Sequence, residues 1–174
     1  DNDGQTVAAN EEGDIAIRVK PNRAPGLFTE YRGDKERFDA CFVGDWYITG
    51  DRGYIDDDGY FWFVSRADDV ILSAGYRIGP FEVESALIEH AAVVESAVVA
   101  SPDETRGAVV KAFVVLAPGI TGTDALAQEL KDHVKNVTAP YKYPRKIQFV
   151  DALPKTVSGK IRRVELRALE TDAS

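Results

Sequence analysis

The chain has 174 residues, a net charge of −8 and 44% hydrophobic residues, which is typical of one globular domain or of one domain with part of another. No apolar run reaches the roughly 20 residues that span a bilayer, and a pI near 4.8 argues against nucleic acid as a partner. The single Cys41 excludes an intrachain disulfide and suits a reducing compartment. His90 and His133 are isolated and form no zinc motif.

The first third of the sequence predicts a β-rich region. Its predicted strands are short and rich in β-branched or aromatic residues: 15–19, 42–47, 59–64 and, as a strand or a linker, 67–74. The acidic run from Asp56 to Asp58 precedes Gly59, and this pattern favours an exposed hairpin turn over a metal site.

From Gly79 onward the hydrophobic pattern alternates between helix and strand, which predicts an α+β fold. Pro80 suits a first helical turn. The predicted buried stripes of three helices are Val83, Ala86 and Leu87; Leu126, Leu130 and Val134 within Asp124 to Lys135; and Ile161, Val164, Ala168 and Leu169. The predicted strands are 93–100, 109–116 and 147–150. We expect a small mixed C-terminal domain of strands with three helices, preceded by a β-rich piece.

The sequence PKTVSGKIRR begins at Pro154 and places Lys160 behind Gly159 in a short polar loop. A lysine after glycine is typical of a phosphate-binding P-loop, but that motif needs glycine where Pro154 stands and Ser or Thr where Ile161 stands. The P-loop interpretation therefore fails. The run 141–167 carries eight Lys or Arg and two Asp or Glu, and this reversal of sign in an acidic chain favours an anionic ligand.

Three ordered motifs resemble acyl-adenylate-forming enzymes, which include acyl- and aryl-CoA synthetases, peptide-synthetase adenylation domains and firefly luciferase. The motifs are DWYITGDRGYIDDDGYFWFVSRADDVILSAGYRIGPFEVESAL (45–87), VTAPYKYPRKIQFVDALPKT (137–156) and PKTVSGKIRR (154–163). The resemblance runs from about residue 13 to residue 167 and looks closest to the medium-chain acyl-CoA synthetase branch.

The resemblance implies that residues 1–67 are the C-terminal β-rich portion of a large AMP-binding domain and that residues 68–174 are its mobile C-terminal domain. The Ser/Thr/Gly-rich loop for the ATP phosphates and the pocket for the carboxylic acid belong to the large domain, and neither is found here. The chain begins at Asp1 and contains no Met. We therefore expect a C-terminal fragment that is inactive by itself, and a longer protein that is the catalyst.

The same resemblance gives Asp51 and Arg66 roles in nucleotide binding. The carboxylate of Asp51, behind a Gly turn, can accept two hydrogen bonds and so suits the paired hydroxyls of a ribose. Arg66, fifteen residues on, would be the matching donor, and Asp68 would be the hinge between the two domains. A general acid/base pair of Asp68 with Asp69 is disfavoured, because neighbours on an extended segment point to opposite faces.

CoA-binding residues follow from the same match. Ala74, Gly75 and Tyr76 would pair with the pantetheine arm through main-chain groups, since Gly75 leaves room beside the backbone. Arg77 would meet the nucleotide phosphate or the substrate. Further expected CoA contacts are cationic or lie in the YKYPRK segment: Arg106, Lys135, Tyr143, Pro144 and Arg145.

Lys160 is the expected catalytic residue and also an ATP contact, because an ammonium between the carboxylate and the α-phosphate offsets their repulsion. The resemblance implies an AMP-forming carboxylate–CoA ligase that uses ATP, CoA and Mg²⁺ and acts on a fatty or aromatic acid. No Mg²⁺ ligand can be assigned within this chain. A lysine acetyltransferase acting on Lys160 is an expected partner, whereas nucleic acid and membrane are not. The expected location is the cytoplasm, or the mitochondrial matrix in a eukaryote.

Two alternatives stay open at this point. The chain would also suit the adenylation domain of another adenylate-forming class, such as a peptide synthetase. It would also suit an isolated nucleotide- or CoA-binding module without activity. The residues that precede Asp1 in a longer protein would distinguish these alternatives.

Overall fold

The computed structural model describes residues 1 and 3–171. The chain divides into two compact units, Asp1–Asp68 (unit 1) and Asp69–Ser174 (unit 2). In the part of the chain that the structure describes, no helix is both long enough and apolar enough to cross a membrane.

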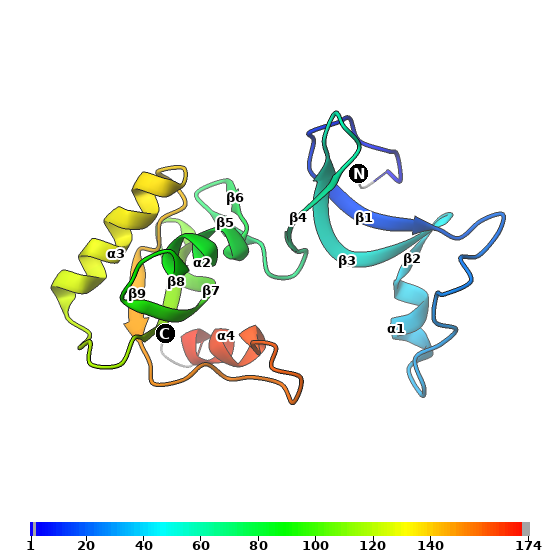
Figure 1. Ribbon diagram of the computed structural model, residues 1–174. Coiled ribbons are helices and arrows are strands. Elements are labelled where there is room, and N and C mark those ends of the chain that lie inside the picture. The colour runs from blue at the N-terminus through cyan, green and yellow to red at the C-terminus, as the bar shows by residue number, and fades with distance from the viewer. Residues whose placement is uncertain (2, 172–174) are drawn as a thin grey trace. The chain divides into compact units, whose positions relative to one another are not determined.

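Unit 1 is built on the long strand β3 (Trp46–Ile55), which pairs antiparallel with β1 (Gly13–Arg18), β2 (Phe42–Val43) and β4 (Phe61–Arg66). A short helix, α1 (Lys35–Ala40), precedes β2 (Figure 1) and was not predicted. Its N-cap is Asp34, whose carboxylate accepts a hydrogen bond from the Arg37 amide at 3.0 Å.

The predicted strand 42–47 is wrong, because a tight turn divides it. β2 ends at Val43, and the chain reverses through Gly44 with a φ of +57° before β3 begins at Trp46. That backbone conformation favours glycine. The aromatic pattern on both sides of the turn conceals the interruption.

The predicted turn at the acidic run is confirmed. The Asp56 carboxylate accepts hydrogen bonds from the backbone amides of Asp58 and Tyr60 and from the Trp62 indole. These donors, the indole first, lower the pKa of Asp56. Gly59 has a φ of +85° and completes the connection between β3 and β4.

Unit 2 has a three-stranded sheet in the order β7 (Val93–Asp103), β8 (Gly107–Leu116) and β9 (Lys146–Phe149), with β9 parallel to β8. Its helices are α2 (Pro80–Ile88), α3 (Asp124–Val137) and α4 (Arg163–Thr171) (Figure 1). A separate hairpin joins β5 (Ile71–Ser73) to β6 (Tyr76–Ile78). The predicted α+β class with three helices in this region is confirmed.

Side chains alternate between the two faces of the unit 2 sheet, as strand geometry requires. Val98, Val110 and Val114 pack in one core cluster with α2 and α3. Val99 and Phe113 pack in a second cluster with Leu166 of α4. The sheet therefore lies between two helical layers, each with its own core.

The predicted stripe of the last helix is wrong. α4 begins at Arg163, so Ile161 lies outside it and pairs with Lys155 in an isolated bridge. Val164 is 60% exposed and Leu169 is 56% exposed, whereas Leu166 is buried. The inner face of α4 carries charged side chains, Arg163 and the buried Glu170, beside Leu166, and hydrophobic periodicity does not detect the charged ones.

Candidate functional site

Asp51 and Arg66 lie opposite each other on β3 and β4. The Arg66 guanidinium donates to the Asp51 carboxylate at 3.0 Å and to the Thr49 carbonyl at 3.3 Å. Burial would lower the pKa of Arg66, but the hydrogen bond and charge of Asp51, followed by Asp68, raise it. The structure therefore brings the two predicted nucleotide ligands together as a half-exposed ion pair.

Gly50 is required by this arrangement. It has a φ of +78°, and a Cβ at this position would lie 2.8 Å from a guanidinium nitrogen of Arg66. Any side chain would thus displace the arginine from Asp51 as well as strain the backbone. The turn at Gly50 and the Asp51–Arg66 ion pair therefore depend on each other.

Asp68, the predicted hinge, is the last residue of unit 1. Its carboxylate is 3.5 Å from Nε of Arg66, and its side chain is 68% exposed. This exposed pair is a weak restraint. The predicted hinge residue is thus held only loosely by its neighbours.

The predicted pantetheine segment forms the tip of the β5–β6 hairpin. Ser73 pairs with Tyr76, and the two residues between them have positive φ values, +49° at Ala74 and +85° at Gly75. Two positive φ values in a two-residue loop are typical of a type I′ turn. A Cβ on Gly75 would meet no atom within 4 Å, so the backbone at the tip is open to a ligand.

Arg106 is connected to this tip through its main chain. The Ala74 amide donates to the Arg106 carbonyl at 3.2 Å. The Arg106 amide in turn donates to Asp103, in the turn between β7 and β8. Arg77 follows on β6 with an exposed side chain and pairs across the hairpin with Leu72. Arg106 and the hairpin tip are therefore neighbours.

Lys135, Tyr143 and Arg145 form one basic-aromatic cluster. The Lys135 ammonium lies 4.2 Å and the Arg145 guanidinium 5.0 Å from the centroid of the Tyr143 ring. Arg145 also donates to the Tyr143 hydroxyl at 2.8 Å. Pro144 is fully buried, so its ring offers no surface to a ligand and it holds the chain beneath the cluster instead.

Tyr76 is stacked on Tyr141, with the ring centroids 4.4 Å apart and the planes 17° from parallel. Both rings are about half exposed. Tyr141 belongs to the YKYPRK segment, which also supplies Tyr143. The structure thus connects the hairpin to the segment of predicted CoA contacts, a connection that sequence spacing did not reveal.

Lys160 lies in a small loop whose stem is the bridge between Lys155 and Ile161. The Thr156 amide donates to the Lys160 carbonyl at 2.8 Å, and the Lys160 amide donates to the Thr156 hydroxyl at 3.1 Å. Gly159 has a φ of +83° and closes the turn. Among the described residues, the Lys160 ammonium has no hydrogen-bond or ion-pair partner, so its charge is available to an anion.

Comparison with known proteins identifies this arrangement. Residues 82–160 match the family described as AMP-binding enzyme C-terminal domain. The matched residues lie within unit 2. The expected resemblance to acyl-adenylate-forming enzymes is confirmed.

Relatives of known function match nearly the whole chain. Over 172 residues, 98% of the chain, it is 59% identical to acyl-coenzyme A synthetase ACSM3, mitochondrial, of Mus musculus and 60% identical to ACSM4, mitochondrial, of Homo sapiens. The chain spans about 30% of the length of each relative. It is also similar to the anthranilate CoA ligase AuaEII in complex with anthranoyl-AMP, with a TM-score of 0.86 and 39% identity over 100% of this chain and 33% of that chain.

Sequence reasoning missed the anchors that hold the lysine loop. Lys155, at the first end of the loop, pairs with Glu95 at 2.5 Å. Arg163, just after the loop, makes a bidentate pair with the buried Glu84: Nη2 donates to Oε2 at 2.7 Å and Nε donates to Oε1 at 3.2 Å. Arg163 was assigned to the basic run 141–167, which favours an anionic ligand, and its pairing with Glu84 was not predicted.

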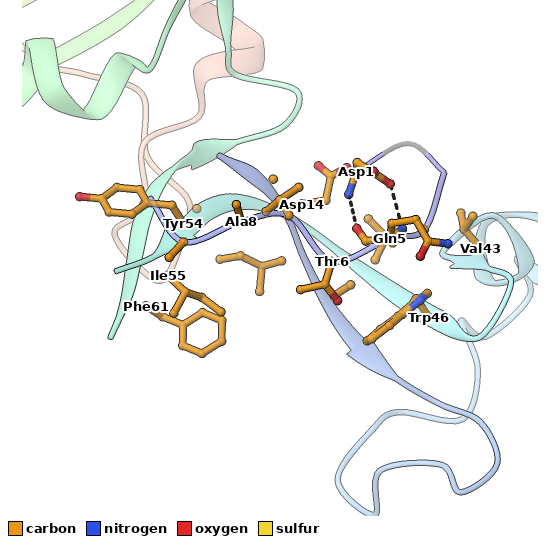
Figure 2. Close-up of a pocket in the computed structure, with 18 of the residues that line it drawn as sticks. Asp1, Gln5, Thr6, Ala8, Asp14, Val43, Trp46, Tyr54, Ile55 and Phe61 are labelled. Atoms are coloured by element: carbon orange, nitrogen blue, oxygen red, sulfur yellow. Dashed lines mark hydrogen bonds between the residues drawn. The ribbon is translucent and has the colours of Figure 1, made fainter. Parts of the chain in front are cut away.

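Unit 1 carries an apolar pocket of about 710 Å³, and none of the predicted ligand-binding residues lines it. Figure 2 shows Val43 and Trp46 towards one end of it and Tyr54, Ile55 and Phe61 towards the other. Its lining is mostly hydrocarbon and includes no Lys, Arg or His side chain. The pocket therefore suits apolar packing and not a phosphate.

The described residues contain no group of three or more His, Cys, Asp or Glu side chains that could hold a metal ion. What the chain does supply is a free ammonium, an Asp–Arg pair and an open hairpin backbone.

Proposed function

We propose that this chain is the C-terminal part of an AMP-forming carboxylate–CoA ligase, an acyl-CoA synthetase. The observation that carries this proposal is the 59–60% identity to acyl-coenzyme A synthetases across 98% of the chain. Since the chain spans about 30% of those proteins, the activity belongs to a longer protein. The rest of that protein would contain the loop that binds the ATP phosphates and the pocket that selects the acyl chain length.

Lys160 would act in the first half-reaction. A carboxylate oxygen of the acid forms a bond to the α-phosphorus of ATP, the bond to the pyrophosphate oxygen breaks, and pyrophosphate leaves. Two anions approach in this step, and an unpaired ammonium between them lowers the repulsion. The exposed, unpaired amine of Lys160 supports this role. No general base is required, because the carboxylate is already ionised at pH 7.

The β5–β6 hairpin would act in the second half-reaction. The CoA sulfur forms a bond to the acyl carbon, the bond from that carbon to the AMP oxygen breaks, and AMP leaves while the thiol proton passes to solvent. The open backbone at Ala74 and Gly75 supports a path for the pantetheine arm. Arg106 and the Lys135, Tyr143 and Arg145 cluster would bind the nucleotide phosphates of CoA, and Arg77 would meet an anionic group of the substrate.

Asp51 would bind the ribose of ATP, with Arg66 fixing its carboxylate. Asp68 would be the hinge that exchanges Lys160 for the hairpin between the two half-reactions. Its weak pairing supports this role, since a residue that must change φ and ψ cannot be held tightly.

Residues 1–67 would be the end of the large AMP-binding domain, and residues 68–174 the mobile domain. The apolar pocket of unit 1 and the exposed Phe61 support packing of this unit against the preceding part of the longer protein. Both mammalian relatives are named as mitochondrial. A eukaryotic parent protein would therefore act in the mitochondrial matrix.

Pyrophosphate exchange tests the proposal directly. The full-length protein should exchange labelled pyrophosphate into ATP in the presence of a carboxylic acid and should release AMP with an acyl-CoA when CoA is added. A panel of linear, branched and aromatic acids identifies the substrate. Transfer of the acyl group to a carrier protein or an amine but not to CoA would instead favour another adenylate-forming class. Robust exchange by the 174-residue chain alone would overturn the division of roles between domains.

Lys160 would also be a site of regulation by a lysine acetyltransferase. Its loop is exposed, and Ser158 and Gly159 on its N-terminal side are small, so a modifying enzyme has access. Acetylation removes the charge that adenylation uses. Full-length protein acetylated at Lys160 should lose pyrophosphate exchange and regain it on deacetylation. An unchanged exchange rate after stoichiometric acetylation would contradict this role.

A further inference from the structure

Four charged side chains form a shielded network in unit 2. The Arg163 guanidinium donates from Nη2 to Oε2 of Glu84 at 2.7 Å and from Nε to Oε1 at 3.2 Å, and its Nη1 lies 3.5 Å from the Asp69 carboxylate. Arg167 donates to the other oxygen of Asp69 at 2.6 Å. The Glu84 and Asp69 side chains are only 8% and 11% exposed. Two cations therefore meet two anions where water screens them little.

The network joins three segments that the proposed function uses. Asp69 is the first residue of unit 2 and follows the predicted hinge. Glu84 lies on α2, the helix that follows the β5–β6 hairpin, and its carboxylate also accepts a hydrogen bond from the Val98 amide of β7 at 2.7 Å. Arg163 begins α4, three residues after Lys160. One ion network thus connects the hinge end, the helix after the hairpin and the end of the lysine loop.

The Lys160 loop depends on its two ends for its position. Its tip is exposed, and the contacts that shape it lie within the loop itself, between Thr156, Gly159 and Lys160. One end is held by Lys155, whose pair with Glu95 is about 40% exposed and so restrains weakly. The other end is held by the shielded, bidentate Arg163 pair. Because it is forked and shielded, the Arg163 end is the stronger restraint.

We propose that Arg163 is a positioning residue for Lys160. Its pair with Glu84 and its link to Asp69 fix the lysine loop to the segment after the hinge, so that loop and hinge end move as one body. Since this role rests on the proposed function, it applies to the adenylation half-reaction. A displacement of about 1 Å at a reacting group can cost about 100-fold in rate, so loosening this anchor should slow adenylation while the Gly75 hairpin still serves thioester formation.

The competing account is that the network stabilises the fold alone. Removing one partner of a buried ion pair leaves the other charge uncompensated and destabilises a protein in general. A purely structural role would lower both half-reactions by the same factor, through the fraction of folded protein. A positioning role separates them. The ratio of the two rates in folded protein therefore distinguishes the two accounts.

Arg163→Gln in the full-length protein is the decisive variant. Pyrophosphate exchange should fall by about 100-fold in kcat, while single-turnover thioester formation from supplied acyl-adenylate and CoA should stay within about 3-fold of the parent. Arg162→Gln is the matched control, because Arg162 carries the same charge beside Arg163 but, among the described residues, its side chain forms an ion pair only with the half-exposed Glu165; it should retain both rates. Arg163→Lys should recover only part of the exchange, because an ammonium cannot make the forked contact.

A second measurement reports the loop without activity. Trypsin cleavage after Lys160, followed by mass spectrometry under native conditions, should be about 10-fold faster in Arg163→Gln than in Arg162→Gln, as expected when a local restraint is lost. If Arg163→Gln does not fold, Glu84→Gln carries the test, since its amide oxygen can still accept the Val98 hydrogen bond; exchange should then fall while thioester formation persists.

The outcomes separate the two proposals. Equal loss of both half-reactions in folded protein, or no loss of exchange in either variant, would overturn the positioning role. Absence of exchange and of thioester formation in the unmodified full-length protein would overturn the proposed function instead. In that case the rate of trypsin cleavage after Lys160 tests the anchoring role of Arg163 by itself. Unchanged cleavage in both Arg163→Gln and Glu84→Gln would reject that role.

Discussion

The Lys160 loop and the β5–β6 hairpin are both tight turns in unit 2, and they present opposite kinds of group. Gly75 and Gly159 both have positive φ, and a Cβ on either would meet no atom within 4 Å. At Gly75 the exposed element is bare backbone. At Lys160 it is a long cationic side chain whose loop is held by ion pairs at its base.

The difference shows what a turn needs in order to expose its backbone to a ligand, and what a loop needs in order to expose a charged side chain. A hairpin that offers its backbone needs only a type I′ turn and a residue without a side chain. A loop that offers a charge must leave that charge unpaired and must fix the chain on which it stands. For this reason the lysine loop depends on Arg163 and Glu84, far away in sequence, whereas the hairpin is determined almost locally.

Lys160→Ala gives the largest expected effect and would separate the two turns most clearly. Loss of one preorganised charge at a transition state costs about 100- to 1,000-fold. Pyrophosphate exchange by the full-length protein should fall by this factor, while thioester formation from supplied acyl-adenylate should persist. Both rates are measured on the same preparation.

Lys155→Ala is the matched control for this variant. It removes the same charge from the same loop, but from a lysine that already pairs with Glu95. Exchange should fall by less than about 5-fold, as expected for an exposed pair. If the Lys155 and Lys160 variants lost exchange equally, the net charge of the loop and not the position of Lys160 would explain the loss.

Gly75→Leu should produce the reverse pattern, with a smaller effect. The added side chain would occupy the open space beside the hairpin backbone, and φ of +85° would strain it by about 1–2 kcal/mol. Thioester formation should fall by about 100-fold, a loss typical of a misplaced reactant, with exchange nearly unchanged. Single-turnover acyl transfer to CoA measures the effect.

Gly119→Leu controls for backbone strain, because Gly119 also has a positive φ, +84°, and open space around it. It should lower stability to a similar degree without separating the half-reactions. Should the Gly119 variant lose thioester formation as the Gly75 variant does, strain and not blockage of a ligand path would be the cause.

Most elements of unit 2 could be predicted, because their apolar residues recur at helix or strand spacing and the fold buries them on one side. α2 begins at the predicted Pro80, and Val83 and Leu87 are buried as expected. Prediction failed where other forces determine the structure. Gly44 interrupts an aromatic run by backbone conformation, and α4 is oriented by charged residues that a hydrophobic pattern treats as surface.

The candidate site could be predicted in part for a related reason. Motifs identify residue types, so Asp51 and Arg66 were named and the structure places them 3.0 Å apart. Contacts between distant segments leave no mark in a single sequence. The stacking of Tyr76 on Tyr141 and the Arg163–Glu84 anchor join residues 65 and 79 positions apart, and only the fold reveals them.

A change at Glu170, near the C-terminal end of α4, should have the smallest effect on the Lys160 loop and on the β5–β6 hairpin. The Lys111 ammonium donates to the Glu170 carboxylate at 2.5 Å, and both side chains are largely buried. Burial would raise the pKa of Glu170, but hydrogen bonds from Lys111 and Ser101 lower it below its ordinary value. The ionised carboxylate therefore stabilises the folded protein at neutral pH, and this contribution is lost as the pH falls through the pKa of the folded state.

Glu170→Gln should lower the free energy of unfolding by about 3 kcal/mol at pH 7, because it leaves Lys111 buried and unpaired. The difference from the parent protein should shrink as the pH falls, since the parent carboxylate then becomes neutral as well. Urea unfolding at several pH values measures this, and both half-reactions of the full-length protein should keep their rates below the unfolding range. Loss of exchange in folded Glu170→Gln would mean that the lysine loop is sensitive to the whole of α4 and not specifically to the anchor at Arg163.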